Sequence, residues 1–488
     1  MTSLSWPWTR PQRVEPGAVE VVSRYRWTSA VLYGATFAWA IGFAAMAADR
    51  HRSFISHKYD LGNMVQVVWS TAHGRFLENT ATDGTQMSRL GTHVDPFLAL
   101  FAPLWWLWPS PELLTTLQSV AIATGALPVF WLARKHTGDA RAALCLALAY
   151  LLLPTVQWQA LDDFHPVAFA IPFLLFCIWF LDEDRPVPAV MFGILAASTK
   201  EDIPLVLAGV AVWYGFRHRR WILAATLAAL SLAWTAAALW VVIPHFSGAE
   251  SPFYRRLESV GGSPRGVLTT LVTDPSSIWH AVTTGADLRY VAALLLPFLL
   301  LPLLEPLLVV AAVPVLALSL LSDFESMTSV RFHYASAPLA CLVAATAIGV
   351  RRLPRRVAIA ALVGVLVAAT IATSAGPLSM VGNYGVTKRP SSAAVRVAHK
   401  AMALVPPDAA VSASNRIGAQ LSERRRIFIF PVRAPADWVV VDQDDPISEA
   451  ATQPAYRAAV AAILVDPAWA HVFDEGGVHV LRRRATDT

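Results

Sequence analysis

Residues 27–48, WTSAVLYGATFAWAIGFAAMAA, form the first apolar run of the chain that is long enough to cross a lipid bilayer. Arg24 and Arg26 stand immediately before this run. Because cytoplasmic segments of membrane proteins collect Lys and Arg, the pattern predicts a retained first helix that enters from the cytoplasm. We expect the polar, proline-containing residues 1–23 to form a cytoplasmic tail.

The composition of the whole chain agrees with this start. Of its 488 residues, 55% are hydrophobic and only 15% are charged. Soluble domains carry about 25% charged residues, so the sequence indicates an all-α polytopic membrane protein. The basic residues stand in short loops between apolar runs and form no patch with interleaved aromatics, which argues against nucleic-acid binding. The three cysteines lie inside apolar runs and predict no disulfide framework.

The membrane topology depends on residues 94–109, VDPFLALFAPLWWLWP. This segment is short, broken by Pro96 and Pro103 and rich in tryptophan, so we interpret it as interfacial and not as a span. It then belongs to a first external loop, residues 49–112, within a transmembrane domain of residues 24–375. Eleven spans are expected, at about 27–48, 113–133, 140–159, 166–181, 187–199, 203–216, 221–244, 290–304, 306–321, 335–350 and 356–375.

Five loops fall on the cytoplasmic side under this interpretation: residues 134–141, 182–185, 217–220, 305–306 and 351–356. Three of them are clearly basic, as the positive-inside rule requires. The loop Asp182-Glu183-Asp184-Arg185 departs from the rule.

From Gly376 onward the composition changes to strand-like and helix-like runs with Pro-Pro and Asp-Pro punctuation. We expect strands near 410–413, 427–430, 438–441 and 478–481, and helices near 393–404 and 454–464. Residues 376–488 therefore predict a small α/β domain, which the topology places outside the cell. We expect the basic runs Arg424–Arg426 and Arg482–Arg484 to lie on its solvated face.

Polar clusters at the ends of the expected spans all fall on the extracytoplasmic side. They are Tyr59-Asp60, His93 and Asp95, Asp162-Asp163 with His165, Lys200-Glu201-Asp202, and Arg331 with His333 and Tyr334. Ionisable residues near membrane depth are costly, and they are usually functional where several converge.

Each cluster also has a simpler explanation. Asp60 by itself fits an ordinary loop acid. Asp162, Asp163 and His165 could bind a divalent cation or supply a base, or they could form a solvated turn before Pro166. Lys200-Glu201-Asp202 could mark a hairpin turn, although a lysine here also suits a lipid phosphate. The sequence contains no His-Glu-x-x-His zinc motif, P-loop, dinucleotide fingerprint or Gly-x-Ser-x-Gly.

Five motifs resemble the bacterial membrane family called domain of unknown function 2079. They are Tyr59-Asp60-Leu61-Gly62, His93-Val94-Asp95-Pro96, Asp163-Phe164-His165-Pro166, Lys200-Glu201-Asp202 and Arg331-Phe332-His333-Tyr334. The order of the parts also resembles the GT-C superfamily of polyprenyl-phosphate-sugar-dependent glycosyltransferases: a first helix, a long external loop with an early Asp, and a soluble external domain at the end.

The GT-C resemblance implies a transferase in the cell membrane that moves a sugar from a polyprenyl-phosphate donor to a cell-envelope glycan, lipid or protein. Asp60 would be the general base, and Asp162, Asp163 and His165 would assist it, orient the acceptor or hold a cation. Lys200 and Arg331 would face Asp60 across the lipid phosphate. The remaining polar residues of the motifs would contact substrate: Tyr59, His93, Asp95, Glu201, Asp202, His333 and Tyr334.

Two other functions fit the same charges. One is a transporter or flippase for a lipid-linked glycan, although such proteins usually show inverted repeats and broken helices near the bilayer midplane, whereas here the charges cluster at one face and the sequence shows no repeat. The other is a non-catalytic protein of envelope assembly. Since Asp60 is followed by Leu-Gly and not by a second acid, the sequence leaves the metal requirement open.

Overall fold

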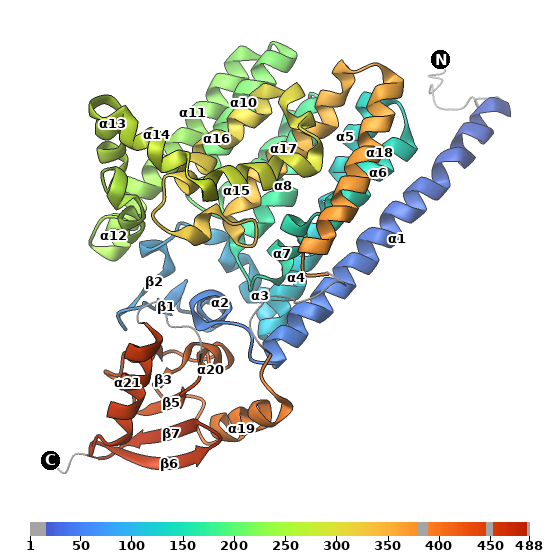
Figure 1. Ribbon diagram of the computed structural model, residues 1–488. Helices are drawn as coiled ribbons and strands as arrows, with labels where there is room; N and C mark the ends of the chain where they lie inside the picture. The colour runs from blue at the N-terminus through green and yellow to red at the C-terminus, as the bar shows by residue number, and fades with distance from the viewer. Residues whose placement is uncertain (1–15, 379–388, 446–451, 486–488) are drawn as a thin grey trace, which may run out of the picture.

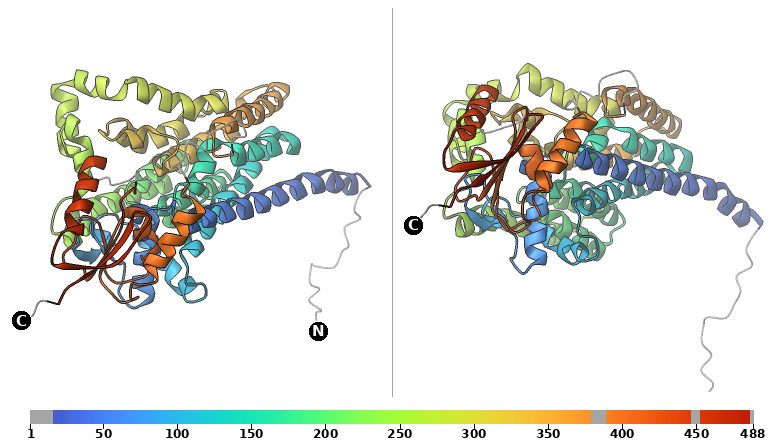
Figure 2. Two further views of the ribbon diagram at one scale, coloured as in Figure 1. Left: turned by 60° about the horizontal axis from the view of Figure 1, so that its bottom comes forward. Right: turned by 90° about the horizontal axis from the view of Figure 1, so that it is seen from below.

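The computed structural model describes residues 16–378, 389–445 and 452–485, which form a helical bundle with a small mixed sheet at one end (Figure 1). The bundle includes the helices α1 (Pro16–Arg52), α4 (Pro111–Thr124), α5 (Ala126–Thr137), α6 (Ala140–Leu152), α7 (Pro154–Leu161), α8 (Ala170–Asp182), α9 (Pro186–Ala197), α10 (Ile203–His218), α11 (Trp221–Ala237), α16 (Pro306–Leu320), α17 (Ser336–Gly349) and α18 (Arg355–Ala372). Helix α1 packs on α4 and α6 along one side of the bundle, and its N-terminal end extends beyond the other helices (Figure 2).

Among the described residues, five helices are long and apolar enough to cross a membrane, and a sixth span results if α6 and α7, bent by 46°, are counted together. These six correspond to the spans expected at 27–48, 113–133, 140–159, 221–244, 335–350 and 356–375. The spans expected at 166–181, 187–199, 203–216 and 306–321 are present as shorter helices. The prediction of a helical membrane protein is confirmed, whereas length alone supports fewer than eleven crossings.

Two boundaries differ from the expectation. Helix α1 begins at Pro16, within residues 1–23, which were expected to form a cytoplasmic tail; residues 1–15 lie outside the described part. Proline suits the first position of a helix, where its missing N–H is not needed. The expected span at 290–304 is not one helix, because α15 (Gly285–Leu295) gives way to short 3₁₀ turns around Pro297 and Pro302. Leu299 and Leu300 between them have φ angles of 53° and 60°, in the left-handed region that ends a helix.

The charged residues lie at the ends of the helices. At one end of the bundle, ion pairs connect all five loops that the sequence assigned to the cytoplasm. The carboxylate of Asp182 is fully buried and pairs with Lys135, His136 and Arg217 at 2.7, 3.0 and 3.1 Å. Glu305 pairs with Arg351 and Arg352, Asp184 with Arg220, and Asp139 with Arg355. The acidic loop 182–185 therefore lies among the basic loops as their counter-ion, which explains its departure from the charge rule.

The segment expected at the interface is a run of short turns, with a 3₁₀ helix at Pro96–Phe101 followed by α3 (Ala102–Trp105). Trp106 and Leu107 after it are 69% and 83% exposed, which suits contact with lipid headgroups. Helix α2 (Asn63–Ala72) is buried, and a hairpin of β1 (Glu78–Thr80) and β2 (Gln86–Ser88) follows it. After α11, a π-helical turn leads to α12 (Ile243–Ser247), and then come α13 (Pro264–Thr273) and α14 (Pro275–Val282).

The C-terminal domain is a five-stranded mixed sheet in the order β4-β3-β5-β7-β6, flanked by three helices. Its elements are α19 (Ser392–Met402), β3 (Val411–Ala413), α20 (Asn415–Gln420), β4 (Ile427–Ile429), β5 (Trp438–Asp442), α21 (Gln453–Leu464), β6 (Trp469–Glu475) and β7 (Val478–Arg483). Strand β3 pairs in parallel with β4 and β5, and β7 pairs antiparallel with β5 and β6. The predicted α/β character is confirmed, and β6 and α20 are additional elements.

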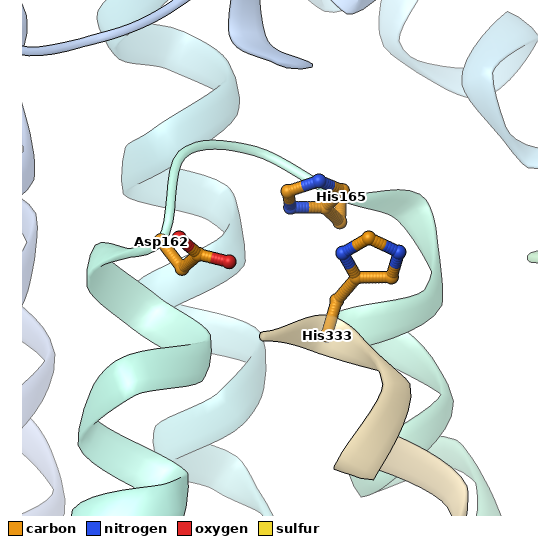
Figure 3. Close-up of side chains that lie close together, drawn as sticks. All are labelled: Asp162, His165 and His333. Atoms are coloured by element: carbon orange, nitrogen blue, oxygen red, sulfur yellow. The ribbon is translucent and has the colours of Figure 1, made fainter. Parts of the chain in front are cut away.

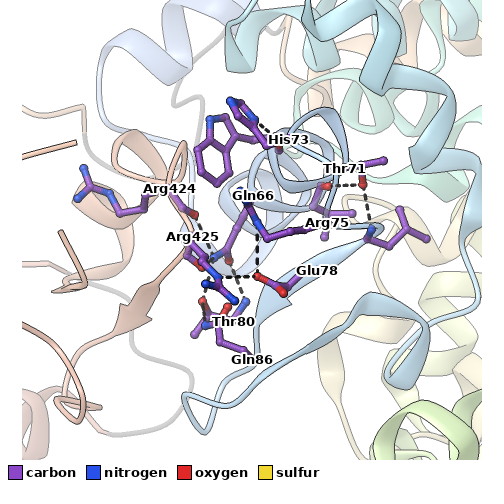
Figure 4. A network of polar contacts seen from close by, with 12 residues as sticks. Gln66, Thr71, His73, Arg75, Glu78, Thr80, Gln86, Arg424 and Arg425 are labelled. Carbon is purple, nitrogen blue, oxygen red and sulfur yellow. Dashed lines mark hydrogen bonds and ion pairs between the residues drawn. The ribbon is translucent and has the colours of Figure 1, made fainter. Parts of the chain in front are cut away.

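The C-terminal domain docks onto the polar segment after α1 through a network of hydrogen bonds (Figure 4). Gln66 on α2 donates to the backbone oxygens of Arg424 and Arg425, and the backbone N–H of Ile427 donates to Thr80. The side chain of Arg424 is itself buried and donates to three backbone carbonyls, so its expected placement on a solvated face is wrong. Buried polar groups have to be hydrogen-bonded, and these contacts fix the domain to the bundle.

Gly62 is the tightest point of this docking surface. A Cβ atom at Gly62 would lie 2.6 Å from Ser422 Oγ and 3.2 Å from the Cα of Ala419. Gly62→Ala is therefore expected to lower the free energy of unfolding by about 1–3 kcal/mol, the usual cost of overpacking. Thermal unfolding of the purified protein in detergent would measure the loss.

Gly34→Ala is the matched control, because a Cβ atom there meets nothing within 4 Å. Alanine normally stabilises a helix by about 1 kcal/mol relative to glycine, so the control should be neutral or more stable. Equal thermal stability of the two variants would show that Gly62 is not a close contact.

Candidate functional site

Asp60 lies in a short π-helix, Lys58–Gly62, between α1 and α2. Its Oδ1 is 3.2 Å from Nε2 of His165, and its side chain keeps 39% of its surface exposed. On the other side, the backbone N–H of Tyr59 donates to Asn415 of the C-terminal domain at 3.2 Å. A single turn of π-helix often occurs at functional sites, and this one is held by the bundle and by the C-terminal domain together.

His165 belongs to the loop between α7 and the 3₁₀ turn Pro166–Phe169, and Gln118 on α4 fixes this loop. The Gln118 amide nitrogen donates to the backbone oxygens of Gln159 and Asp163, and its oxygen accepts from the N–H of His165 at 2.8 Å. Asp163 has a φ of 49°, a left-handed conformation that Asp adopts more readily than most residues. The tight turn brings Asp162 and His165 close to each other and directs Asp163 toward His57.

Asp163 points back to the segment after α1. Its Oδ2 accepts from the backbone N–H of His57 at 2.8 Å and lies 3.2 Å from the Nδ1 of the same residue. Asp163 is thus used to hold His57 in place, and His57 in turn contributes charge next to Asp60.

His333 completes the cluster from the start of the segment that leads into α17. Gln159 on α7 donates to the backbone oxygen of Phe332 and accepts from Ser336, so the two segments are tied together. The rings of His165 and His333 are stacked with centroids 3.9 Å apart (Figure 3). Asp162, His165 and His333 therefore converge from two parts of the sequence that are far apart.

The electrostatic surroundings separate the two carboxyl groups Asp60 and Asp162. Desolvation alone would raise the pKa of Asp60, but the hydrogen bond and charge of His165, with His57 and Arg89, outweigh it and lower the pKa. Burial raises the pKa of Asp162 to about 7. Two carboxyl groups in one site with pKa values pushed apart are typical of sites that move protons.

A second polar group adjoins the first through Tyr334. His93 Nδ1 lies 2.8 Å from Glu201, whose other oxygen accepts from the backbone N–H of Val94. Lys200 pairs with Asp202 at 2.6 Å, and its ammonium group stands 5.9 Å from the centre of the Tyr334 ring.

Asp95 lies in the same region as His93. Its carboxylate is buried and pairs with Arg89 at 3.0 Å. The structure thus brings together nearly all of the polar residues that the sequence singled out.

Arg331 is the exception. Its guanidinium group lies over the ring of Trp158, 4.9 Å from the ring centre, and lines a hollow of about 690 Å³ between α7, α15 and α18. The walls of this hollow are mainly apolar, with Leu296 and Ile371 among them. Lys200 instead lines a separate, small hollow beside His333. Lys200 and Arg331 therefore line separate hollows, whereas the sequence led us to expect both of them to face Asp60 across one lipid-phosphate site.

Several residues of the site were not singled out from the sequence. His57 and Lys58 stand beside Asp60, and proximity alone could have pointed to them. Lys58 is buried, and its ammonium group donates to Asn63; burial lowers its pKa to about 7. Arg256 donates to Tyr334 Oη at 3.2 Å, and the buried Arg416 of the C-terminal domain acts electrostatically on His57. Neither arginine has a local sequence signal, because each reaches the site from a distant segment.

Comparison with known proteins relates the chain to one family. The family described as "Predicted membrane protein (DUF2079)" matches residues 50–462. Two solved structures of ArnT from Cupriavidus metallidurans are similar, one bound to undecaprenyl phosphate with a TM-score of 0.49 and 13% identity, the other in the apo state with a TM-score of 0.48 and 14% identity. Each comparison covers 92% of this chain and 98% of the other. A search of curated proteins gave no match. At these scores the two structures assign neither an activity nor a substrate to this chain.

Proposed function

This chain belongs to the family described as "Predicted membrane protein (DUF2079)", and we propose that it is a membrane glycosyltransferase that moves a sugar from a polyprenyl-phosphate donor to an acceptor of the cell envelope. The family description assigns no activity, so the proposal rests on the site and on the sequence motifs. The observation that carries it is the pair Asp60–His165, 3.2 Å apart, with the Asp60 carboxylate still 39% exposed at the end of an apolar bundle.

Asp60 is the general base of the proposed reaction. An acceptor hydroxyl attacks the anomeric carbon of the donor sugar, the bond from that carbon to the phosphate oxygen breaks, and the hydroxyl proton passes to the Asp60 carboxylate. One oxygen of Asp60 is held by His165, so the carboxylate is oriented before the acceptor arrives. A positioned base of this kind typically contributes 10²–10⁴-fold to the rate.

The leaving group is a polyprenyl phosphate, whose charge needs nearby cations. Lys200 and Arg256 both lie near Tyr334: the Lys200 ammonium group is 5.9 Å and the Arg256 guanidinium carbon 5.7 Å from the ring centre, and Arg256 donates to Tyr334 Oη. We assign these two cations to the phosphate. This pair replaces the pair Lys200–Arg331 that the sequence suggested.

The hollow beside Arg331 suits the lipid part of the donor. Its volume of about 690 Å³ lies within the 300–1,000 Å³ range of ligand sites, and its walls are mostly apolar with one guanidinium group. One of its walls is α18, which is long and apolar enough to span a membrane, and another is α7, which is so when it is counted together with α6. A prenyl chain can therefore lie against the protein without leaving an apolar environment.

The proposed site works on the extracytoplasmic side. The five loops joined by Asp182, Glu305 and their partners include the basic ones, and basic loops are retained in the cytoplasm. The C-terminal domain then lies outside the cell, since it docks on the segment that carries Asp60.

Transfer of a radiolabelled sugar from a panel of polyprenyl-phosphate donors tests the function. Wild-type protein in proteoliposomes should transfer sugar from at least one donor, and Asp60→Asn should lower kcat by about 100- to 10,000-fold because the base is lost. Asp83→Asn is the matched control: Asp83 lies in the same external loop, is exposed, and bonds only to nearby Thr85 within the described residues.

Two results would contradict this proposal. Asp60→Asn transferring as fast as wild type would remove Asp60 as the base. Movement of a labelled lipid-linked glycan across the bilayer, with no transfer from any donor, would favour the transporter instead.

Cysteine labelling tests the orientation separately. In a background without Cys145, the native cysteine that is partly accessible, Arg426→Cys should react with a membrane-impermeant maleimide in intact cells. Arg220→Cys should react only after permeabilisation, because the Arg220 side chain is 60% exposed at the other end of the bundle. The reverse pattern would invert the topology.

A further inference from the structure

We propose that Asp162, His165 and His333 bind one divalent transition-metal ion and that Asp60 orients His165 from behind. One carboxylate oxygen of Asp162 and one ring nitrogen of each histidine lie within 4.8 Å of one another. Figure 3 shows the Asp162 carboxylate beside the two stacked rings, with a nitrogen of each ring on its side.

The donor set selects the kind of ion. Two imidazoles and one carboxylate suit Zn²⁺ and other first-row divalent metals, whereas Mg²⁺ and Ca²⁺ prefer oxygen ligands alone. Three protein ligands with a fourth position open is the pattern of zinc sites that act on a substrate, and closed sites of four protein ligands are structural.

Two of the three proposed ligands have atoms that could bind a metal ion and that make no hydrogen bond within the described residues. The Nδ1 atom of His333 is buried and has no hydrogen-bond partner among the residues that the structure describes. Within the same residues, the Asp162 carboxylate takes part in no hydrogen bond or ion pair, although it is largely surrounded by protein. A buried polar atom without a partner is costly, and a metal ion would satisfy both groups at once.

Asp60 supplies the support that a metal-binding histidine normally has. Its Oδ1 is 3.2 Å from Nε2 of His165, which leaves Nδ1 of His165 for the ion. Histidine ligands almost always donate their other ring N–H to a carboxylate, a carbonyl or water, which fixes the tautomer and the ring orientation.

The rings need a modest rearrangement to bind. They are stacked at 3.9 Å with 22° between their planes, so their lone pairs do not yet point at one position. Ligand atoms about 2.0–2.1 Å from a tetrahedral zinc are roughly 3.3 Å apart, which requires the donor atoms to approach by up to about 1.5 Å. Rotation of His333 about its side-chain torsions provides such a movement.

A neighbouring group, His57, Asp60 and Asp163, is a weaker candidate although its donor atoms are equally close. Asp163 Oδ2 already accepts from the backbone N–H of His57 and contacts its Nδ1, and Asp60 contacts His165. His57 Nε2 is also buried without a partner among the described residues. Both carboxylates of this group, however, already make contacts that an ion would have to replace.

In the proposed transferase the open position of the ion would receive an oxygen of the donor phosphate, so this role rests on the proposed function. Binding of the ion itself does not, and it is measured without any sugar donor.

The experiment uses full-length protein with a tag that contains no histidine, purified in detergent and stripped with EDTA. Titration with Co²⁺, followed by its visible absorption, and with Zn²⁺, followed by metal analysis after gel filtration, should give about one ion per chain. Asp162→Asn and His333→Gln should each weaken binding by more than about 100-fold, and Asp60→Asn by about 10- to 100-fold, the usual effect of removing an outer partner. His333→Asp keeps a ligand and should retain binding, with the preference moved from Zn²⁺ toward Mn²⁺.

His280→Gln is the control for adventitious binding, because His280 is exposed on α14 and, within the part of the chain that the structure describes, its side chain bonds only to its own helix. Monodisperse gel filtration of each variant, and recovery in His333→Asp, separate loss of the site from misfolding. No stoichiometric ion in the wild type, or equal affinity in Asp162→Asn and His333→Gln, would overturn the proposal. One bound ion in a protein that transfers no sugar would leave the metal site standing and remove the proposed function.

Discussion

The structure depends on the cost of leaving an ionisable side chain unpaired in an apolar layer. An unpaired charge within an apolar bundle is expensive, so charges are confined to the helix ends and paired there. At one end Asp182 and Glu305 connect the basic loops. At the other end His93–Glu201 joins two distant segments, and Arg89–Asp95 and Lys200–Asp202 pair charges within their own loops. The loops are positioned by these pairs, and the pairs define two chemically different ends. Within the described residues, His333 Nδ1 is buried without a hydrogen-bond partner. A ring nitrogen of His333 lies within 4.8 Å of the neighbouring donor atoms of Asp162 and His165, where a metal ion could bind.

The same constraint explains how the C-terminal domain affects the site. The π-helix that carries Asp60 is too short to fix itself, and it is held by His165 from the bundle and by Asn415 from the domain. Glycine at position 62 allows α20 to approach this turn closely, and Lys58 lies buried in the same contact. A change in the docking of the domain would therefore move Asp60 before it moved any residue of the bundle. The site is a joint product of segments that are more than 350 residues apart in the sequence.

Much of this could be predicted from the sequence, and the failures have physical causes. Apolar runs predicted most helices, and four of the five C-terminal strands were expected because they are buried, β-branched runs. Strand β6 was missed because it is largely exposed and contains charged residues, so it has no apolar pattern to detect. The span at 290–304 was wrong because composition records hydrophobicity but not the breaks around Pro297 and Pro302. The polar clusters were found because charges at the ends of apolar runs are conspicuous. Arg256 and Arg416 were not found, since a single arginine outside such a cluster carries no sign of where the fold will bring it. Arg331 was placed wrongly for the same reason.

The two roles assigned to Asp60 are compatible because a carboxylate has two oxygens. Among the described residues, Oδ1 is the oxygen that contacts His165, and the side chain as a whole remains 39% exposed. One oxygen can therefore fix the orientation of His165 while the other accepts a proton from an acceptor hydroxyl. If His165 binds an ion through Nδ1, its Nε2–H becomes a better donor to Asp60, and the carboxylate is held more firmly in the same orientation. Asp60 and the ion would then lie on opposite edges of one imidazole ring, so the base and the phosphate-binding position would be set by a single side chain. Since that side chain is fixed in turn by Gln118 on α4, the geometry of the proposed reaction traces back to a buried amide inside the bundle.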